Sequence, residues 1–293
     1  MGITGAGKSS FINYLLRYLG SEKRVLVGED LVSCTSQVES IIIEGQTNHW
    51  KRIKGHRIVI VDTPGFEDTY VGDFVILQRI ARWLEESYRK KMVVGGVIYM
   101  HDLSQDHISV TTRRNLALFN ELCGDWAFDK VVLVTSKWSR AFERSFDKRE
   151  EEMKNKGWKT MLDGGARVER LVAGGEDASA WGVIRSILDR VEKRAIEQYK
   201  SEALQIQREL VTYRKFLPET RAARELRTQF KQMLEAQAQM LALEADAVAR
   251  NPEAQAKLQE QEAKVKKMAK QIENLKVSLP KRLTRWLKVV VGA

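Results

Sequence analysis

The stretch Gly2-Ile3-Thr4-Gly5-Ala6-Gly7-Lys8-Ser9 predicts the fold of the part of the chain that follows it. Its spacing, G-x-x-x-x-G-K-S, is typical of a loop that turns successive backbone N–H groups onto a phosphate, because glycine adopts conformations that side chains forbid. Lys8 is expected to bring its ammonium to the β- and γ-phosphates and Ser9 its hydroxyl to Mg²⁺. Residues 10–16 are expected to form a helix whose N-terminal end faces the anion. The candidate phosphate-binding residues are Gly2, Thr4, Gly5, Ala6, Gly7, Lys8, Ser9 and Ser10.

A loop of this kind joins a buried strand to a helix, and only Met1 precedes Gly2. The first strand of the domain is therefore expected to be missing from the sequence. Two alternatives stay open: a chain whose natural start lies further upstream, and a degenerate domain.

The charge of the chain is placed unevenly. Residues 1–182 carry 26 Lys and Arg against 25 Asp and Glu, whereas residues 183–293 carry 23 against 14. The basic surplus could attract anionic lipid, RNA or an acidic partner, but a solvated helical surface is the favoured interpretation and no nucleic-acid partner is expected. The two cysteines, Cys34 and Cys123, make no disulfide framework and suit a reducing compartment, so a cytoplasmic location is predicted.

Short apolar runs alternate with helical patterns along the first part of the chain. This alternation predicts an α/β fold, a mostly parallel three-layer domain over residues 1–182 whose ligands bind at the carboxyl ends of the strands. The first two strands are expected to pair as an antiparallel hairpin. The predicted strands are residues 38–44, 57–62, 93–100, 131–134 and 168–173, and the predicted helices between them are residues 74–90, 111–122 and 141–161.

Residues 183–293 are predicted to form a basic, all-helical extension. Apolar residues recur at alternating spacings of three and four between Ile196 and Leu217 and again between Val265 and Leu279, as in coiled-coil seams. An antiparallel hairpin or small bundle is expected, and a long intermolecular coil is the alternative, so self-association or partner binding through this extension is predicted. Residues 281–291 have the pattern of an interfacial helix on an anionic membrane, with packing on the chain's own bundle as the favoured alternative.

A second motif, Asp62-Thr63-Pro64-Gly65, follows the apolar strand of residues 58–61. Together with the first motif it resembles the G domain of P-loop GTPases related to translation factors. The wording Asp-Thr-Pro-Gly-Phe is most similar to the septins, the immunity-associated GTPases and the plastid import receptors, and to fungal G-domain proteins with a helical tail. The resemblance implies GTP or GDP and Mg²⁺ as ligands. It also implies that Asp62 holds Mg²⁺ through water, that the Gly65 N–H meets the γ-phosphate, and that Thr35 is the switch threonine, with Ser33 and Ser36 as alternatives.

The guanine-recognition motif of these proteins, [NT]-K-x-D, should follow the strand of residues 131–134. The sequence here is Ser136-Lys137-Trp138-Ser139. Lys137 matches, and its stem would lie over the base. Ser139 stands where an aspartate should accept two hydrogen bonds from guanine, so base selection is expected to be weak. Trp138 is expected either to stack on the base or to belong to the core. Ser179, ahead of the helix expected from Trp181, resembles the last base-contacting loop.

Compared with the same GTPases, this sequence lacks one of the residues expected for hydrolysis. Lys8, Thr35 and Gly65 are the candidate catalytic residues, and Ser9, Thr35 and Asp62 are the candidate ligands of Mg²⁺. Phe66 occupies the place where many small GTPases carry a water-orienting glutamine, and a phenyl ring cannot orient water. The four histidines show no metal-ligand or catalytic spacing. The sequence therefore predicts a slow GTPase that acts as a nucleotide-dependent switch or assembly module; a non-catalytic helical scaffold and an ATP-binding protein are the alternatives.

Overall fold

The computed structural model describes residues 1–27, 38–66, 72–104, 109–140, 145–194 and 203–248, and the single positions 263, 266, 269–270 and 272–273. The chain divides into two compact units, Met1–Tyr213 and Arg214–Ala293. Residue 182, where the sequence suggested a boundary, lies inside helix α6 (Glu176–Lys193), so the first unit continues beyond it.

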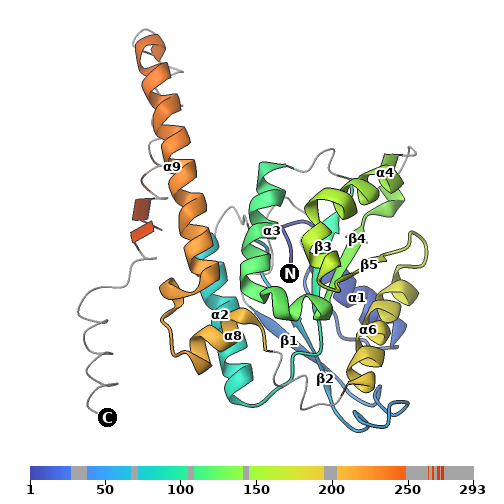
Figure 1. Cartoon of the computed structure of the whole chain (residues 1–293). Coiled ribbons are helices and arrows are strands. Elements are labelled where there is room, and N and C mark those ends of the chain that lie inside the picture. Colours follow the sequence, from blue (N-terminus) through green and yellow to red (C-terminus); the bar gives the residue numbers. More distant parts are fainter. Residues whose placement is uncertain are drawn as a thin grey trace, which may run out of the picture. The chain divides into compact units, whose positions relative to one another are not determined.

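Two sheets form the centre of the first unit (Figure 1). β1 (Glu39–Ile43) and β2 (Ile58–Asp62) pair antiparallel, as predicted for a hairpin. β3 (Val97–Asp102), β4 (Val131–Ser136) and β5 (Arg167–Arg170) form a parallel sheet in the order β3-β4-β5. The predicted α/β class with a mostly parallel sheet is confirmed.

The start of the chain contacts both sheets. The Met1 amine donates to the carbonyl of Ile98 at 2.7 Å, and the Met100 N–H donates to the carbonyl of Met1 at 2.9 Å. Ile3 forms a parallel bridge with Phe66, which follows β2. The first phosphate-binding residues are therefore held between the end of β2 and strand β3.

Helices α1 (Lys8–Tyr18) and α6 cover one face of the sheets. Both helices repeat apolar residues at helical spacing, and these residues are buried together with alternate residues of the strands. The shared core contains Phe11, Ile12, Leu15 and Leu16 of α1, Val183, Ile184 and Ile187 of α6, and Ile41, Ile43, Val132 and Val134 of the strands.

The opposite face carries α2 (Asp73–Arg89) and α3 (Val110–Cys123). Tyr99 of β3 packs on Phe119 of α3 with ring centroids 4.8 Å apart, and its hydroxyl donates to Asn115 at 3.0 Å. The helices on both sides complete the three layers that the alternation predicted. Between α3 and β5 the chain forms 3-10 turns at Asp125–Lys130 and Trp138–Arg140, α4 (Ser145–Glu152), a π-helical turn at Met153–Gly157, and α5 (Lys159–Asp163).

Two predicted elements differ in extent. The strand expected over residues 93–100 begins only at Val97, which pairs with Val131, the first residue of its neighbour β4. At its other end the strand continues to Asp102. The strand expected over residues 168–173 is confined to β5 and ends at Arg170.

The seam predicted from Ile196 to Leu217 is not one helix in the described residues. Two consecutive helical turns, Gln205–Gln207 (α8) and Arg208–Thr212, end at Thr212. Arg214, two residues further on, has a left-handed φ of 50°. α8 packs against α2 and α3, and the Gln207 amide donates to the carbonyl of Leu84 at 3.1 Å. Among the described residues of this stretch, Ala203, Ile206 and Leu210 are buried in the first unit.

The second unit begins with a 3-10 turn at Leu217–Glu219, followed by the 28-residue helix α9 (Arg221–Val248). Most of the seam at Val265–Leu279 and all of residues 281–291 lie outside the described residues, so neither the predicted bundle nor the interfacial helix is described. Within the described part, no helix is both long and apolar enough to cross a membrane.

Candidate nucleotide-binding site

The glycine-rich loop ends in the first turn of α1. Gly5 and Gly7 have left-handed φ angles of 80° and 89°, which L-residues with side chains rarely adopt, and Gly7 is the N-cap of the helix. Gly2 is required for space as well, since a Cβ there would lie 2.4 Å from the carbonyl oxygen of Met100. The loop therefore has the local conformation that its spacing predicts, at the N-terminal end of a helix whose N–H groups favour an anion.

The Lys8 ammonium lies over this loop. It donates to the carbonyl oxygens of Ile3 at 2.9 Å and Gly2 at 3.3 Å. Both acceptors belong to the loop that is expected to surround the phosphates. An ammonium held there by carbonyls can exchange them for phosphate oxygens with little movement of the side chain.

The two sequence motifs meet at Ser9 and Asp62, which are 53 residues apart in sequence. The Ser9 hydroxyl donates to Asp62 Oδ2 at 2.7 Å, and Asp62, the last residue of β2, is only 1% exposed. A hydroxyl and a carboxylate are hard oxygen ligands of the kind that Mg²⁺ takes together with water and phosphate oxygens. The described residues hold no group of three or more His, Cys, Asp and Glu that could bind a metal. A magnesium site completed by phosphate does not need one.

Gly65 of the second motif packs directly on the phosphate-binding loop. A Cβ at Gly65 would lie 2.5 to 2.7 Å from atoms of Thr4, and the Thr4 N–H donates to the carbonyl of Phe66 at 3.2 Å. The side chain of Phe66 is 2% exposed and belongs to the core. A buried phenyl ring offers no group that could orient water, in agreement with the expectation from sequence.

The switch threonine expected from the sequence, Thr35, lies outside the described residues, as do its alternatives Ser33 and Ser36.

The turn after β4 reaches the phosphate-binding loop from the other side. The Ser136 hydroxyl lies 2.9 Å from the carbonyl of Ala6 and 3.1 Å from that of His101. The next residue, Lys137, has a left-handed φ of 63°, and its ammonium lies 2.6 Å from Asp102 Oδ2 at the end of β3. The residues predicted for base binding therefore lie beside the residues predicted for phosphate binding.

Trp138 is half-buried and held on several sides. Its indole N–H donates to the Thr135 hydroxyl at 3.0 Å, the Arg170 guanidinium lies 4.2 Å from the ring centroid, and Phe146 contacts it edge-on. Ser139 is exposed. Trp138 thus belongs to a packed cluster, whereas the residue at the position of the guanine-reading aspartate faces solvent.

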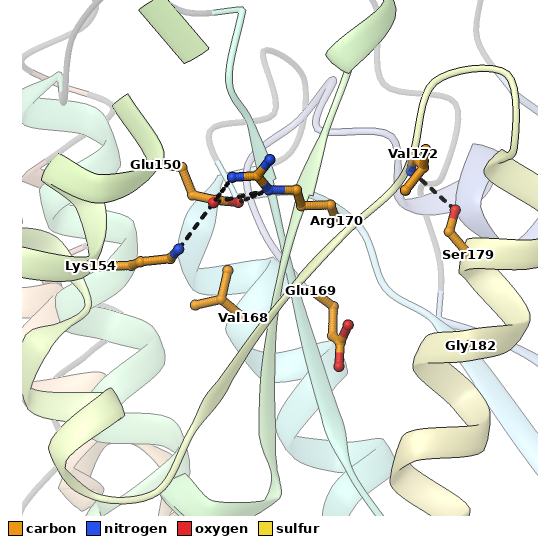
Figure 2. A pocket seen from close by; sticks show the side chains of 8 residues that line it. All are labelled: Glu150, Lys154, Val168, Glu169, Arg170, Val172, Ser179 and Gly182. Carbon is orange, nitrogen blue, oxygen red and sulfur yellow. Dashed lines mark hydrogen bonds and ion pairs between the residues drawn. The ribbon is translucent and has the colours of Figure 1, made fainter. Parts of the chain in front are cut away.

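Glu150 is the anion that holds Arg170 in this cluster. Figure 2 shows its carboxylate between the guanidinium of Arg170 and the ammonium of Lys154, at distances down to 2.5 and 3.1 Å. Burial opposes the ionisation of Glu150, but the hydrogen bonds from Arg170 and Lys154 outweigh it and lower its pKa. The same residues line a cavity of about 440 Å³ along β5, which shares no residue with the phosphate-binding loop.

Ser179, predicted near the base, lies inside the first turns of α6. Its hydroxyl donates to carbonyls of the same helix and accepts the Val172 N–H at 3.1 Å. The residue therefore links α6 to the loop that follows β5.

Of the three described histidines, His101 is buried, whereas His49 and His56 are exposed. His101 is 8% exposed, packs edge-on against Trp158, and has its pKa lowered to about 4, mainly because burial disfavours the charged ring. His49 packs on Trp50. His107 lies outside the described residues.

Asp102 is the site residue that sequence reasoning missed. Its only signal in the sequence is a carboxylate soon after an apolar strand. The register of β3 against β4, which places Asp102 opposite Ser136, is what brings it to the site.

Residues 1–137 match the family model described as 50S ribosome-binding GTPase, a segment that runs from the phosphate-binding loop to Lys137. No curated protein sequence matches the chain significantly. This segment is therefore similar to the GTPases that the family model describes, and both sequence motifs lie within it.

Solved structures of plastid import receptors are similar in fold. The structure of the chloroplast translocon components atToc33 and psToc159 is 16% identical with a TM-score of 0.50, and covers 67% of this chain and 82% of that one. Toc33 from Arabidopsis thaliana in complex with GDP and Mg²⁺, and the same protein with Mg²⁺ and GMPPNP, are each 17% identical with TM-scores of 0.47 and 0.48, and cover 64% of this chain and 81% of theirs. At this identity the likeness concerns the fold.

Proposed function

We propose that this protein binds guanine nucleotide with Mg²⁺, hydrolyses GTP slowly and acts as a nucleotide-dependent switch or assembly module. The observation that carries the proposal is the 2.7 Å hydrogen bond from Ser9 to Asp62, because it joins the two motifs at the place where Mg²⁺ would bind. The Lys8 ammonium over the loop carbonyls supports the same assignment. Toc33, which is similar in fold, has been solved with GDP and with GMPPNP, each together with Mg²⁺.

Slow hydrolysis follows from the residues around the phosphate end. Phe66 is buried and cannot orient a water, so the chain alone is expected to hydrolyse GTP near the unassisted rate of small GTPases, on the order of 10⁻⁴–10⁻³ s⁻¹. A faster rate would require a group from a partner. Dimerization is important for the GTPase activity of atToc33 and psToc159. We propose that self-association of this chain raises its rate in a comparable way.

The switch would act through the loop of Gly65. Gly65 and Phe66 contact Thr4 of the phosphate-binding loop, so a γ-phosphate bound in that loop would affect their positions directly. Thr35 is proposed to close on Mg²⁺ and the γ-phosphate in the triphosphate state. Ordering of these two loops would change the surface offered to a partner.

The part of the predicted basic extension that lies beyond the first unit, residues 214–293, is proposed as the surface for self-association or a protein partner. A cytoplasmic location, with peripheral attachment to anionic membrane through residues 281–291 as an alternative, is proposed on the composition alone.

An ATP-binding protein is the second candidate, and one observation favours it. Ser139 is exposed where a guanine-reading carboxylate should lie, so adenine would not be rejected there. A non-catalytic scaffold is the third. Binding of neither nucleotide would select it.

The test is thermal unfolding with and without saturating Mg·GTP. At a concentration about 100 times the dissociation constant, bound nucleotide should stabilise the wild type by roughly 2.7 kcal/mol. Lys8→Ala should lose this stabilisation, because it removes the cation expected on the β- and γ-phosphates.

The matched control is Lys159→Ala, since Lys159 is exposed and pairs only at the surface with Asp163, 3.2 Å away. This variant should keep the full shift. An equal shift in Lys8→Ala would contradict nucleotide binding at the glycine-rich loop.

A further inference from the structure

A buried carboxylate lies at the junction of β3 and the turn after β4. Asp102 is the last residue of β3, opposite Ser136 in the parallel register, and its side chain is 5% exposed. It accepts three hydrogen bonds: from the Lys137 ammonium at 2.6 Å, and from the backbone N–H and hydroxyl of Ser104 at 2.8 and 2.6 Å. With three donors in place, this carboxylate is occupied within the protein and is not presented to a ligand.

The partner of Asp102 has an unusual backbone. Lys137 adopts a left-handed φ of 63°, a conformation that costs free energy for any residue with a side chain. Its ion pair with Asp102 is largely shielded from water and therefore little screened. The attraction can hold the turn in a shape that Lys137 would not adopt alone.

The same turn is attached to the phosphate-binding loop. Ser136, directly before Lys137, has its hydroxyl 2.9 Å from the Ala6 carbonyl. This contact fixes Ser136 against the loop independently of the Lys137 side chain, so loss of the ion pair would move mainly the stem expected over the base.

We propose that Asp102 is a positioning residue of the nucleotide site, which holds the Lys137 ammonium and thereby keeps the Lys137 stem in place for the nucleobase. This inference rests on the proposed function. It assigns to Asp102 an effect on the base end of the ligand, while the phosphate end is held by Lys8, Ser9 and the backbone of the glycine-rich loop.

The experiment compares two ligands, each with Mg²⁺: GTP, which has a base, and inorganic tripolyphosphate, which has none. Asp102→Asn keeps the shape of the side chain and removes the charge that holds Lys137. It is expected to weaken GTP binding by about tenfold in calorimetric titration and to leave tripolyphosphate binding within about twofold.

Lys137→Met is expected to weaken GTP binding to the same extent, because it removes the other half of the pair. The double variant Asp102→Asn/Lys137→Met should lose no more than either single variant, as expected for residues that act as a unit. Ser104→Ala is the matched control: it removes one hydrogen bond from Asp102 but leaves the ion pair, and should bind GTP nearly as the wild type does.

Equal losses for GTP and tripolyphosphate in Asp102→Asn, additive losses in the double variant, or no loss at all would each overturn the proposal. If Asp102→Asn does not fold, Asp102→Ser takes its place with the same two ligands and in the double variant. A wild type that binds neither ligand would instead contradict the proposed function itself.

Discussion

The phosphate end and the base end of the candidate site differ in how closely they follow the P-loop GTPases. At the phosphate end the motif residues are all present: Ser9 bonds Asp62, and Lys8 bonds carbonyls of the loop. A Cβ at Gly65 would clash with Thr4. At the base end only Lys137 matches, and Ser139 replaces the carboxylate that would read guanine. We therefore expect affinity for a triphosphate and selection of a base to be separate properties of this chain, with only the residues for the first complete.

The largest effect is expected from a substitution at the phosphate end of the site. Gly65→Ala would place a Cβ within 2.5 to 2.7 Å of Thr4, so the two loops would have to separate. Overpacking of this kind costs about 1–3 kcal/mol, and we expect Mg·GTP affinity to fall by up to about 100-fold in titration.

Gly182→Ala is the matched control for this prediction. Gly182 lies inside α6, and a Cβ there would meet nothing within 4 Å. Alanine should therefore stabilise the helix by roughly 0.5–1 kcal/mol and leave binding unchanged. Equal binding by both variants would show that the contact between the loops is unimportant.

Acid should lower the free energy of unfolding through His101 of β3. Burial lowers the pKa of His101 to about 4, whereas an unfolded histidine titrates near 6.5. Between these values the unfolded chain binds a proton that the folded chain does not, so the free energy of unfolding should fall as the pH falls from about 6.5 to 4, by roughly 3 kcal/mol.

Urea denaturation at several pH values measures this slope. His101→Phe keeps an aromatic ring against Trp158 and should show a smaller slope over this interval, whereas the same substitution of exposed His49 should keep it. An unchanged slope in His101→Phe would assign the acid sensitivity to other groups.

A smaller effect is expected on base selection at position 139. Ser139→Asp restores a carboxylate after Lys137, and we expect a gain of about tenfold in the preference for GTP over ATP. Ser139→Asn, which is close in size but uncharged, should gain less. A carboxylate variant with unaltered preference would mean that position 139 does not face the base.

The phosphate end could be predicted from the sequence because its spacing is local. Glycines, lysine and serine in one stretch of eight residues define both the backbone shape and the chemistry, and Asp62-Thr63-Pro64-Gly65 is equally compact. Strands and helices of the first unit followed from their periodicity for the same reason. Boundaries shifted where pairing between distant segments decided them, as at Val97, which lies opposite the first residue of β4.

The remaining features depend on pairing that no single stretch contains. Asp102 reaches Lys137 only because β3 and β4 are parallel neighbours in one register. The seam from Ile196 to Leu217 showed an apolar face, but periodicity does not say what covers such a face, and in the structure α2 and α3 cover α8. The helix expected from Trp181 begins already at Glu176, so Ser179 lies in its first turns.

The most direct test of the difference between the two ends is competition between ATP and GTP for the wild-type protein. A fluorescent GTP analogue is bound in the presence of Mg²⁺ and displaced by each unlabelled nucleotide. With the phosphate end complete and no carboxylate at position 139, we expect ATP to displace the analogue at no more than roughly ten times the GTP concentration. Failure of ATP to compete at about a thousandfold excess would mean that another group reads guanine, and would contradict the account.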